Sequence, residues 1–171
     1  MKRFFSLLLA VVMTAAVLCA CGNANVKTSV PSKYDDGYAA SFSKTTSTDS
    51  NGNKVYEFTK DQYDKYKQNH KNSLGADIQK ELGTLHPSSE DEKVPYGEYA
   101  YINDEKQAVI VGVHTERYDE ATAKTESATV AEYGFKYFQN LKTPVDSIKV
   151  IYCDANNQDK VFGTFEYTAE K

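Results

Sequence analysis

The sequence contains no tryptophan and almost no arginine, since its 171 residues include only Arg3 and Arg117. So few guanidinium groups exclude an arginine-rich clamp for phosphate. Acidic side chains outnumber basic ones, with 24 aspartates and glutamates against 20 lysines and arginines. An acidic chain does not suit a polyanion, so we expect no nucleic acid partner.

Motifs that carry familiar chemistry are missing as well. The chain has no G-x-S-x-G nucleophile elbow, no H-E-x-x-H zinc motif and no glycine-rich phosphate loop. We therefore expect neither a metal ion nor a cofactor. A protein that binds a partner is favoured over one that catalyses a reaction.

The first residues follow the order of a secretory signal peptide. Lys2 and Arg3 precede an apolar run from Phe4 to Leu18, the length that a signal peptide uses. A membrane-spanning helix needs about 20 apolar residues, and this run is shorter. A polar stretch follows from Gly22 onward.

The residues Leu18-Cys19-Ala20-Cys21 resemble the lipobox of bacterial lipoproteins, in which an aliphatic residue and two small residues precede a cysteine. Cys19 is not the commonest small residue at its position. The resemblance implies that residues 1–20 are a removed signal peptide and that Cys21 carries a diacylglyceryl group. It therefore implies a lipid-anchored protein on the extracytoplasmic face of the cell membrane.

Lipidation of Cys21 leaves Cys153 as the one thiol of the mature chain, so no intramolecular disulfide can form. One residue separates Cys19 from Cys21, whereas cysteine pairs that bind zinc usually have two to four between them. The mature chain has 151 residues, which is 171 minus 20, and a net charge of −6, because Lys2 and Arg3 leave with the peptide. That length suits one domain.

The polar stretch after Cys21 lacks apolar periodicity and contains Pro31 and Gly37. We expect residues 21–37 to form a lipid-anchored flexible tether. Residues 38–171 then form a single domain.

Turn signals and apolar periodicity alternate along that domain. Hairpins are predicted at residues 38–59, around Asn51-Gly52, and at 96–114 and 147–170. Helices are predicted at 60–82, which begins with a capping box of Thr59 and Gln62 and stops at Gly83, and at 115–142, which Pro144 ends.

This pattern predicts an α+β fold with a largely antiparallel sheet of about six strands in ββαββαββ order. Two amphipathic helices cover one face of it, and the apolar strand 108–113 lies centrally. The second strand of each hairpin begins at a lysine, with Lys54, Lys106 and Lys160 at intervals of 52 and 54 residues. Either an internal duplication or the ordinary lengths of hairpins and helices would explain this spacing.

Histidine and cysteine provide the candidates for chemistry. His70 lies on the apolar stripe of the first helix, where a buried histidine bonded to a neighbour is favoured over a ligand or base. His114, Cys153 and Asp154 lie at strand ends and form the alternative catalytic set. Burial of Cys153 is favoured over a nucleophilic role, because Asp154 beside it would raise its pKa.

Tyrosine is abundant, with 13 residues, and Tyr96, Tyr99 and Tyr101 lie two or three apart around one strand. Exposed tyrosines are good contact residues, whereas buried ones fill a core that lacks tryptophan. We expect a binding or interaction protein whose partner is an envelope protein, a peptide or a glycan. The alternatives are a small envelope enzyme that uses His114, Cys153 and Asp154, and a scaffold or immunity-type partner protein.

Overall fold

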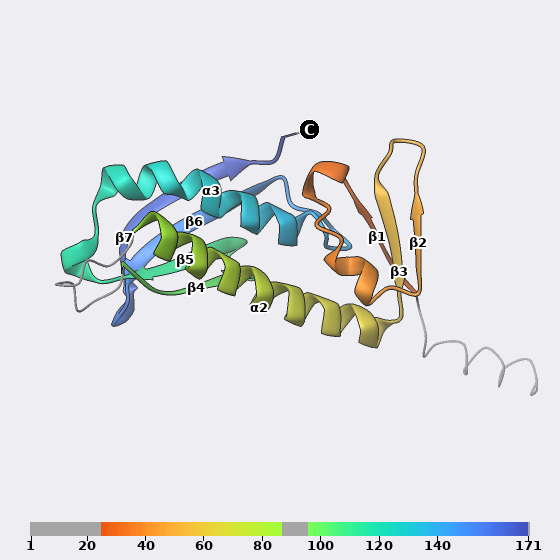
Figure 1. The fold of residues 1–171 in the computed structure, drawn as a ribbon, viewed down its shortest axis with the longest axis horizontal. Helices are drawn as coiled ribbons and strands as arrows, with labels where there is room; N and C mark the ends of the chain where they lie inside the picture. Colours follow the sequence, from red (N-terminus) through yellow and green to blue (C-terminus); the bar gives the residue numbers. More distant parts are fainter. Residues whose placement is uncertain (1–24, 87–95, 171) are drawn as a thin grey trace, which may run out of the picture.

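The computed structural model describes residues 25–86 and 96–170. The predicted signal peptide, the predicted lipidation site Cys21 and the first residues of the predicted tether lie outside this range. Seven strands and two α-helices make up the described part (Figure 1). No helix in these two ranges is long and apolar enough to cross a membrane.

After the single strand β1, hairpins and α-helices alternate along the chain. The strands are β1 (Val26–Val30), β2 (Thr45–Thr48), β3 (Lys54–Phe58), β4 (Gly97–Asn103), β5 (Ala108–Val113), β6 (Ser147–Asp154) and β7 (Asn157–Thr168). The helices are α2 (Lys60–Leu85) and α3 (Glu120–Phe138). Short 3-10 turns are η2 (Ser32–Tyr34), η3 (Tyr38–Ser41) and η4 (Thr115–Arg117).

The predicted α+β class, with two helices and largely antiparallel strands, is confirmed. The strands are divided between a three-stranded sheet of order β1-β3-β2 and a four-stranded sheet of order β4-β5-β6-β7. All pairs are antiparallel except β5 and β6, which α3 connects. A crossover helix is the usual connection between parallel neighbours.

Local sequence signals explain the first hairpin and α2. Gly52 takes a φ of +83° in the turn between β2 and β3, a conformation that glycine adopts without strain. The Thr59 side chain accepts from the Gln62 N–H, and the Gln62 side chain accepts from the Thr59 N–H, which completes the capping box. The predicted apolar stripe is buried: Tyr63, Tyr66, His70, Leu74, Ile78 and Leu82.

Two predicted helix ends are wrong. Helix α2 continues past Gly83 to Leu85, and the N–H of His86 bonds to the Leu82 carbonyl. A glycine in a helix costs only about 1 kcal/mol, which burial of the neighbouring stripe outweighs. Helix α3 ends at Phe138, well before Pro144.

The tether prediction is also wrong for residues 26–37. Residues 26–30 form β1, in which Thr28 and Val30 are buried while Lys27 and Ser29 face solvent. The alternation extends over only five residues of a polar segment, which is too short to predict a strand from the sequence. The following turn buries Tyr34 against Phe135, and residues 38–41, expected to begin a strand, form η3.

Both helices lie on one face of the four-stranded sheet (Figure 1). On that face the core includes Val109, Val111 and Val113 of the central strand β5. Every residue of β5 is buried, as predicted for a strand covered on both sides. On the second face, however, the cover over Ala108 and Ile110 comes from side chains of neighbouring strands.

Helix α2 also lies along the edge strand β4. A Cβ on Gly75 would be 3.0 Å from the Ala100 carbonyl oxygen, so glycine permits this close approach. Gln79 Nε2 donates to the Glu98 carbonyl over 2.8 Å. Covering an edge in this way limits pairing with another chain.

Two helical glycines test the packing. A Cβ on Gly134 would lie 2.6 Å from Ile148 Cδ1 and 2.9 Å from Val109 Cγ2. Gly134→Ala should therefore lower the free energy of unfolding by about 1–3 kcal/mol, measured by urea denaturation. Gly83→Ala is the matched control: no atom lies within 4 Å of its Cβ position, and it should gain up to about 1 kcal/mol. Equal gains at both positions would contradict the helix–sheet packing.

Candidate functional site

The alternative catalytic set of His114, Cys153 and Asp154 does not converge. Cys153 is 1% exposed, and its sulfur lies 3.5 Å from the Tyr99 hydroxyl and 3.7 Å from the Val111 carbonyl oxygen. His114 follows β5, and its Nε2 lies 3.4 Å from Glu98 Oε2. The thiol is thus enclosed by the sheet, and the imidazole pairs with a different residue.

Asp154 belongs to a separate cluster at the end of β6. Its carboxylate accepts from the Asn156 N–H over 2.9 Å, from Thr115 Oγ1 over 2.7 Å and from Lys160 Nζ over 3.1 Å. These three donors, in that order of importance, lower the pKa of Asp154 to about 2. A carboxylate so held is a fixed acceptor that closes the β6–β7 turn.

Tyr99 and Tyr101 lie on the sheet face that the helices do not cover. The Tyr99 ring lies flat over Gly112, where a Cβ would be 2.3 Å from its Cζ. The Tyr101 hydroxyl donates to Gln158 Oε1 over 3.0 Å, and the two ring centroids are 6.0 Å apart. Both side chains are partly exposed, and together they cover buried Ile110.

The same face continues across β6 and β7. Ile151 packs beside the tyrosines, and Val161, opposite Cys153, is 53% exposed. Lys149 and Glu166 pair across the two strands toward one end. We call the set Tyr99, Tyr101, Ile151 and Val161 the tyrosine face; it has an aromatic and aliphatic centre with balanced charge beside it.

Tyr96 does not belong to this face, so its predicted role as an exposed contact residue is wrong. It precedes β4, turns toward α3 and is 3% exposed. Its hydroxyl donates to Glu126 Oε1 over 2.8 Å, and its ring stacks on His86 with centroids 3.7 Å apart. Burial and the Glu126 carboxylate raise the pKa of Tyr96.

Glu126 is the centre of a cluster that the sequence analysis missed. It is 5% exposed, and its second oxygen pairs with His86 Nε2 from the end of α2. A hollow of about 460 Å³ adjoins the pair, lined by Leu85, His86, Ala121, Thr122, Thr125, Glu126 and Thr129. An imidazole oriented by a carboxylate can exchange protons, and the threonine hydroxyls can bind a small polar molecule.

One feature of the sequence could have indicated this cluster. Glu126 lies three residues after Ala123 and four before Val130, both buried, so an acid stands on the apolar stripe of a helix. An acid at such a position is rarely buried without a partner. Its partner His86 is 40 residues away, and no local pattern connects them.

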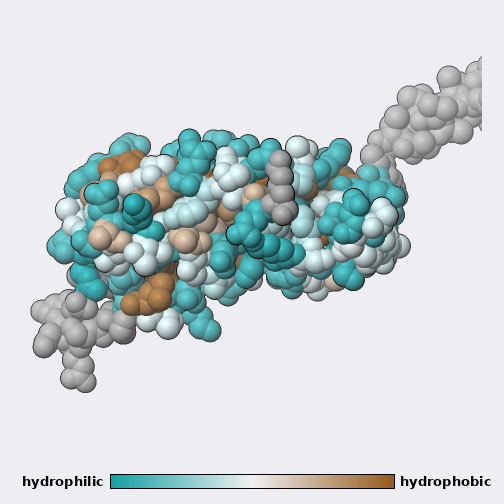
Figure 2. All heavy atoms as spheres, turned by 90° about the horizontal axis from the view of Figure 1, so that it is seen from above, coloured by the Kyte–Doolittle hydropathy of each residue, from teal (hydrophilic) through white to brown (hydrophobic). Residues whose placement is uncertain are grey.

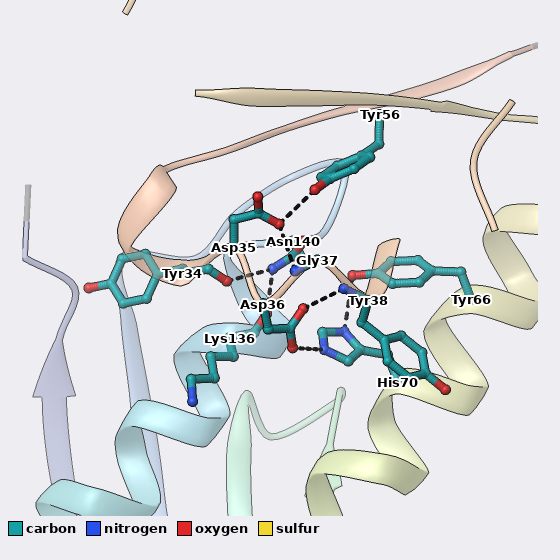
Figure 3. Close-up of polar contacts among 10 residues, drawn as sticks. All are labelled: Tyr34, Asp35, Asp36, Gly37, Tyr38, Tyr56, Tyr66, His70, Lys136 and Asn140. Atoms are coloured by element: carbon teal, nitrogen blue, oxygen red, sulfur yellow. Dashed lines mark hydrogen bonds and ion pairs between the residues drawn. The ribbon is translucent and has the colours of Figure 1, made fainter. Parts of the chain in front are cut away.

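His70 occupies the interior and is fully buried, as the sequence predicts (Figure 3). Its Nε2 lies 2.7 Å from Asp36 Oδ2, and its Nδ1 lies 3.0 Å from the Tyr66 hydroxyl. The imidazole stacks on the ring of Tyr38, with centroids 4.9 Å apart, and its centroid lies 5.2 Å from that of the Tyr66 ring. The ring therefore has both nitrogens bonded and packs among aromatic side chains.

Further contacts fix the same N-terminal segment (Figure 3). Asp35 accepts from the Tyr56 hydroxyl of β3 over 2.7 Å and from the Gly37 N–H over 3.0 Å. Asn140, just after α3, donates to the Tyr34 carbonyl over 3.0 Å. We call Asp35, Asp36, His70 and Asn140 the N-terminal lock, because they join residues 34–38 to β3, α2 and the end of α3.

The comparisons with other proteins are negative: no protein family, curated protein or solved structure matches this chain. Within residues 25–86 and 96–170, no three histidine, cysteine, aspartate or glutamate side chains are grouped so that they could hold a metal ion. The case for a function therefore rests on the arrangement of this chain's own residues.

The N-terminal lock should be sensitive to acid. Burial raises the pKa of Asp36, but its hydrogen bond with His70, the charge of that residue and the Tyr38 N–H lower it below its usual value of 3.8. A carboxylate with a lowered pKa stabilises the fold above its unfolded pKa, and this stability is lost as the pH falls through the folded pKa.

Asp36→Asn should therefore lower the free energy of unfolding by about 1–3 kcal/mol at pH 7. The difference from the parent protein should shrink below about pH 4. Urea denaturation at both pH values measures this, with exposed Asp159→Asn as the control, for which little change is expected. A loss that is the same at pH 7 and pH 3 would show that the Asp36 charge does not hold the lock.

Proposed function

We propose that this chain is a lipid-anchored extracytoplasmic protein that binds a protein partner through its tyrosine face. One observation carries the binding proposal: two adjacent, partly exposed tyrosines lie on a sheet face that no described helix or strand covers. The expected partner is another envelope protein or a peptide segment of one.

The composition of the tyrosine face supports this proposal. Tyrosine buries a large area at little conformational cost, and aromatic residues are enriched at protein interfaces. The ring of Tyr99 is held in place by its packing over Gly112, so little side-chain freedom remains to be lost on binding. Lys149 and Glu166 lie opposite each other on β6 and β7 and carry one charge of each sign, which suits a partner surface without strong charge.

The anchor proposal is supported by the sequence alone. Lys2 and Arg3, the apolar run and the residues Leu18 to Cys21 together resemble a lipoprotein signal. All of these lie outside the described residues.

An envelope enzyme is the second candidate, and the pair His86–Glu126 favours it over the predicted set of His114, Cys153 and Asp154. The imidazole is oriented by a buried carboxylate beside a hollow. The bonded partner of His86 Nε2 is the Glu126 carboxylate, not a hydroxyl or a thiol, so the enzyme candidate ranks below binding. A scaffold or immunity-type protein would use the same tyrosine face.

Mass spectrometry of the native protein tests the anchor. Digestion with trypsin should yield a peptide from Cys21 to Lys27 whose mass includes a diacylglyceryl group on the cysteine sulfur. Residues 1–20 should be absent from the digest. An intact signal peptide, or an unmodified thiol at Cys21, would overturn the lipid anchor.

Photo-crosslinking in intact cells tests the tyrosine face. A photoreactive phenylalanine in place of Tyr101 should give a discrete adduct with a second protein, whereas the same group at exposed Glu132 of α3 should give none. With the probe moved to Ile151, the further change Tyr101→Ala should weaken binding roughly tenfold, as expected for a central aromatic contact, and reduce the adduct. Equal yields at positions 101 and 132, or an adduct only with glycan, would overturn a protein partner on this face.

A further inference from the structure

We infer that the three-stranded sheet rests against the phospholipid headgroups of the anchoring membrane, so that the protein stands end-on. This inference rests on the lipid anchor proposed at Cys21. Strand β1 begins at Val26, so only residues 22–25 separate the anchor from folded structure. Five steps of fully extended chain span at most roughly 18 Å. The start of β1 therefore cannot lie far from the membrane surface.

The short connection cannot be lengthened easily, because β1 is firmly held. It pairs with β3 along its whole length, from Val26 opposite Phe58 to Val30 opposite Lys54. Val30 is fully buried, and the N-terminal lock follows within a few residues. Releasing β1 as extra tether would break the sheet pairing and expose this core, so the sheet stays near the bilayer.

The position of the sheet in the molecule decides which end faces the membrane. Figure 1 shows β1, β2 and β3 together at one end of the elongated fold, with α2 running from them toward the other end. The 26 residues of α2 correspond to roughly 39 Å of helix. The hollow beside His86 lies at the far end of that helix, on the side away from the proposed membrane contact.

Charge favours the same orientation. Residues 25–60 contain five lysines and four acids, a net charge of +1, whereas residues 61–171 contain 13 basic and 20 acidic side chains, a net charge of −7. Two of the four acids, Asp35 and Asp36, bond to Tyr56 and His70. An anionic membrane surface attracts lysines and repels acidic groups, so the acidic body is held away from it.

Exposed polar side chains form the proposed contact. Lys27 pairs with Glu57 over 2.5 Å on the outer side of the sheet, and Lys44 and Lys60 are exposed near the same edge. Figure 2 shows mainly hydrophilic side chains at the end that carries this sheet, with the larger hydrophobic patches toward the other end. Such a surface suits headgroups and does not suit insertion among the acyl chains.

Fluorescence quenching on vesicles tests this orientation. The lipidated mature protein is placed in vesicles of phosphatidylethanolamine and phosphatidylglycerol that carry a nitroxide on their headgroups. A dye is attached at Ser47→Cys, which is exposed on β2, or at Lys124→Cys, which is exposed on α3 near the far end. Buried Cys153 should remain unlabelled. Strong quenching is expected at residue 47 and little at residue 124.

A lengthened connection provides the matched control. A flexible insert of Gly and Ser residues between Asn25 and Val26 should weaken quenching at residue 47, because the sheet is then free to leave the surface. Equal quenching at both labels, or no effect of the insert, would overturn the orientation. Flotation of the protein with the vesicles reports anchorage separately: a protein that does not float refutes the anchor, whereas one that floats without the expected quenching refutes only the orientation.

Discussion

The hydrogen bonds of the buried His70 ring hold the N-terminal segment to the rest of the fold. The imidazole bonds to Asp36 with one nitrogen and to Tyr66 with the other, so the short link between η2 and η3 is joined to the first half of α2. Because Asp36 lies only six residues after β1 ends, the same contact limits how far β1 can move. A segment with the composition of a tether is in this way made part of the domain, which brings the folded body close to residue 21.

Local signals account for most of what the sequence predicted. The capping box, the periodic stripe of α2 and the Asn51-Gly52 turn depend on residues within a few positions of one another, and all three form as expected. The division into two sheets does not follow from such local signals. It arises because β1 pairs with β3 across more than twenty residues and because η3 interrupts the expected strand. Hairpin patterns indicate which strands are consecutive along the chain. They do not determine which strands pair with one another in the sheets.

In the candidate site, too, contacts between near residues were predictable and contacts between distant residues were not. The alternation of β4 indicated correctly that Tyr99 and Tyr101 share a face, since alternate residues of a strand point the same way. Tyr96 lies outside the strand and obeys no such rule, and it pairs with Glu126 from a distant helix. Likewise, Cys153 and His114 end adjacent strands, yet neighbouring backbone does not make their side chains meet.

Helix α2 links these features physically. Its first half carries Tyr66 and His70 into the N-terminal lock, its middle lies against β4 at Gly75, and its last residue precedes His86 at the Glu126 cluster. Since β4 also carries Tyr99 and Tyr101, the helix fixes the tyrosine face relative to the N-terminal segment of the described structure. A rigid connection of this kind means that an anchor before β1 would orient the tyrosine face, instead of leaving it to tumble on a loose chain.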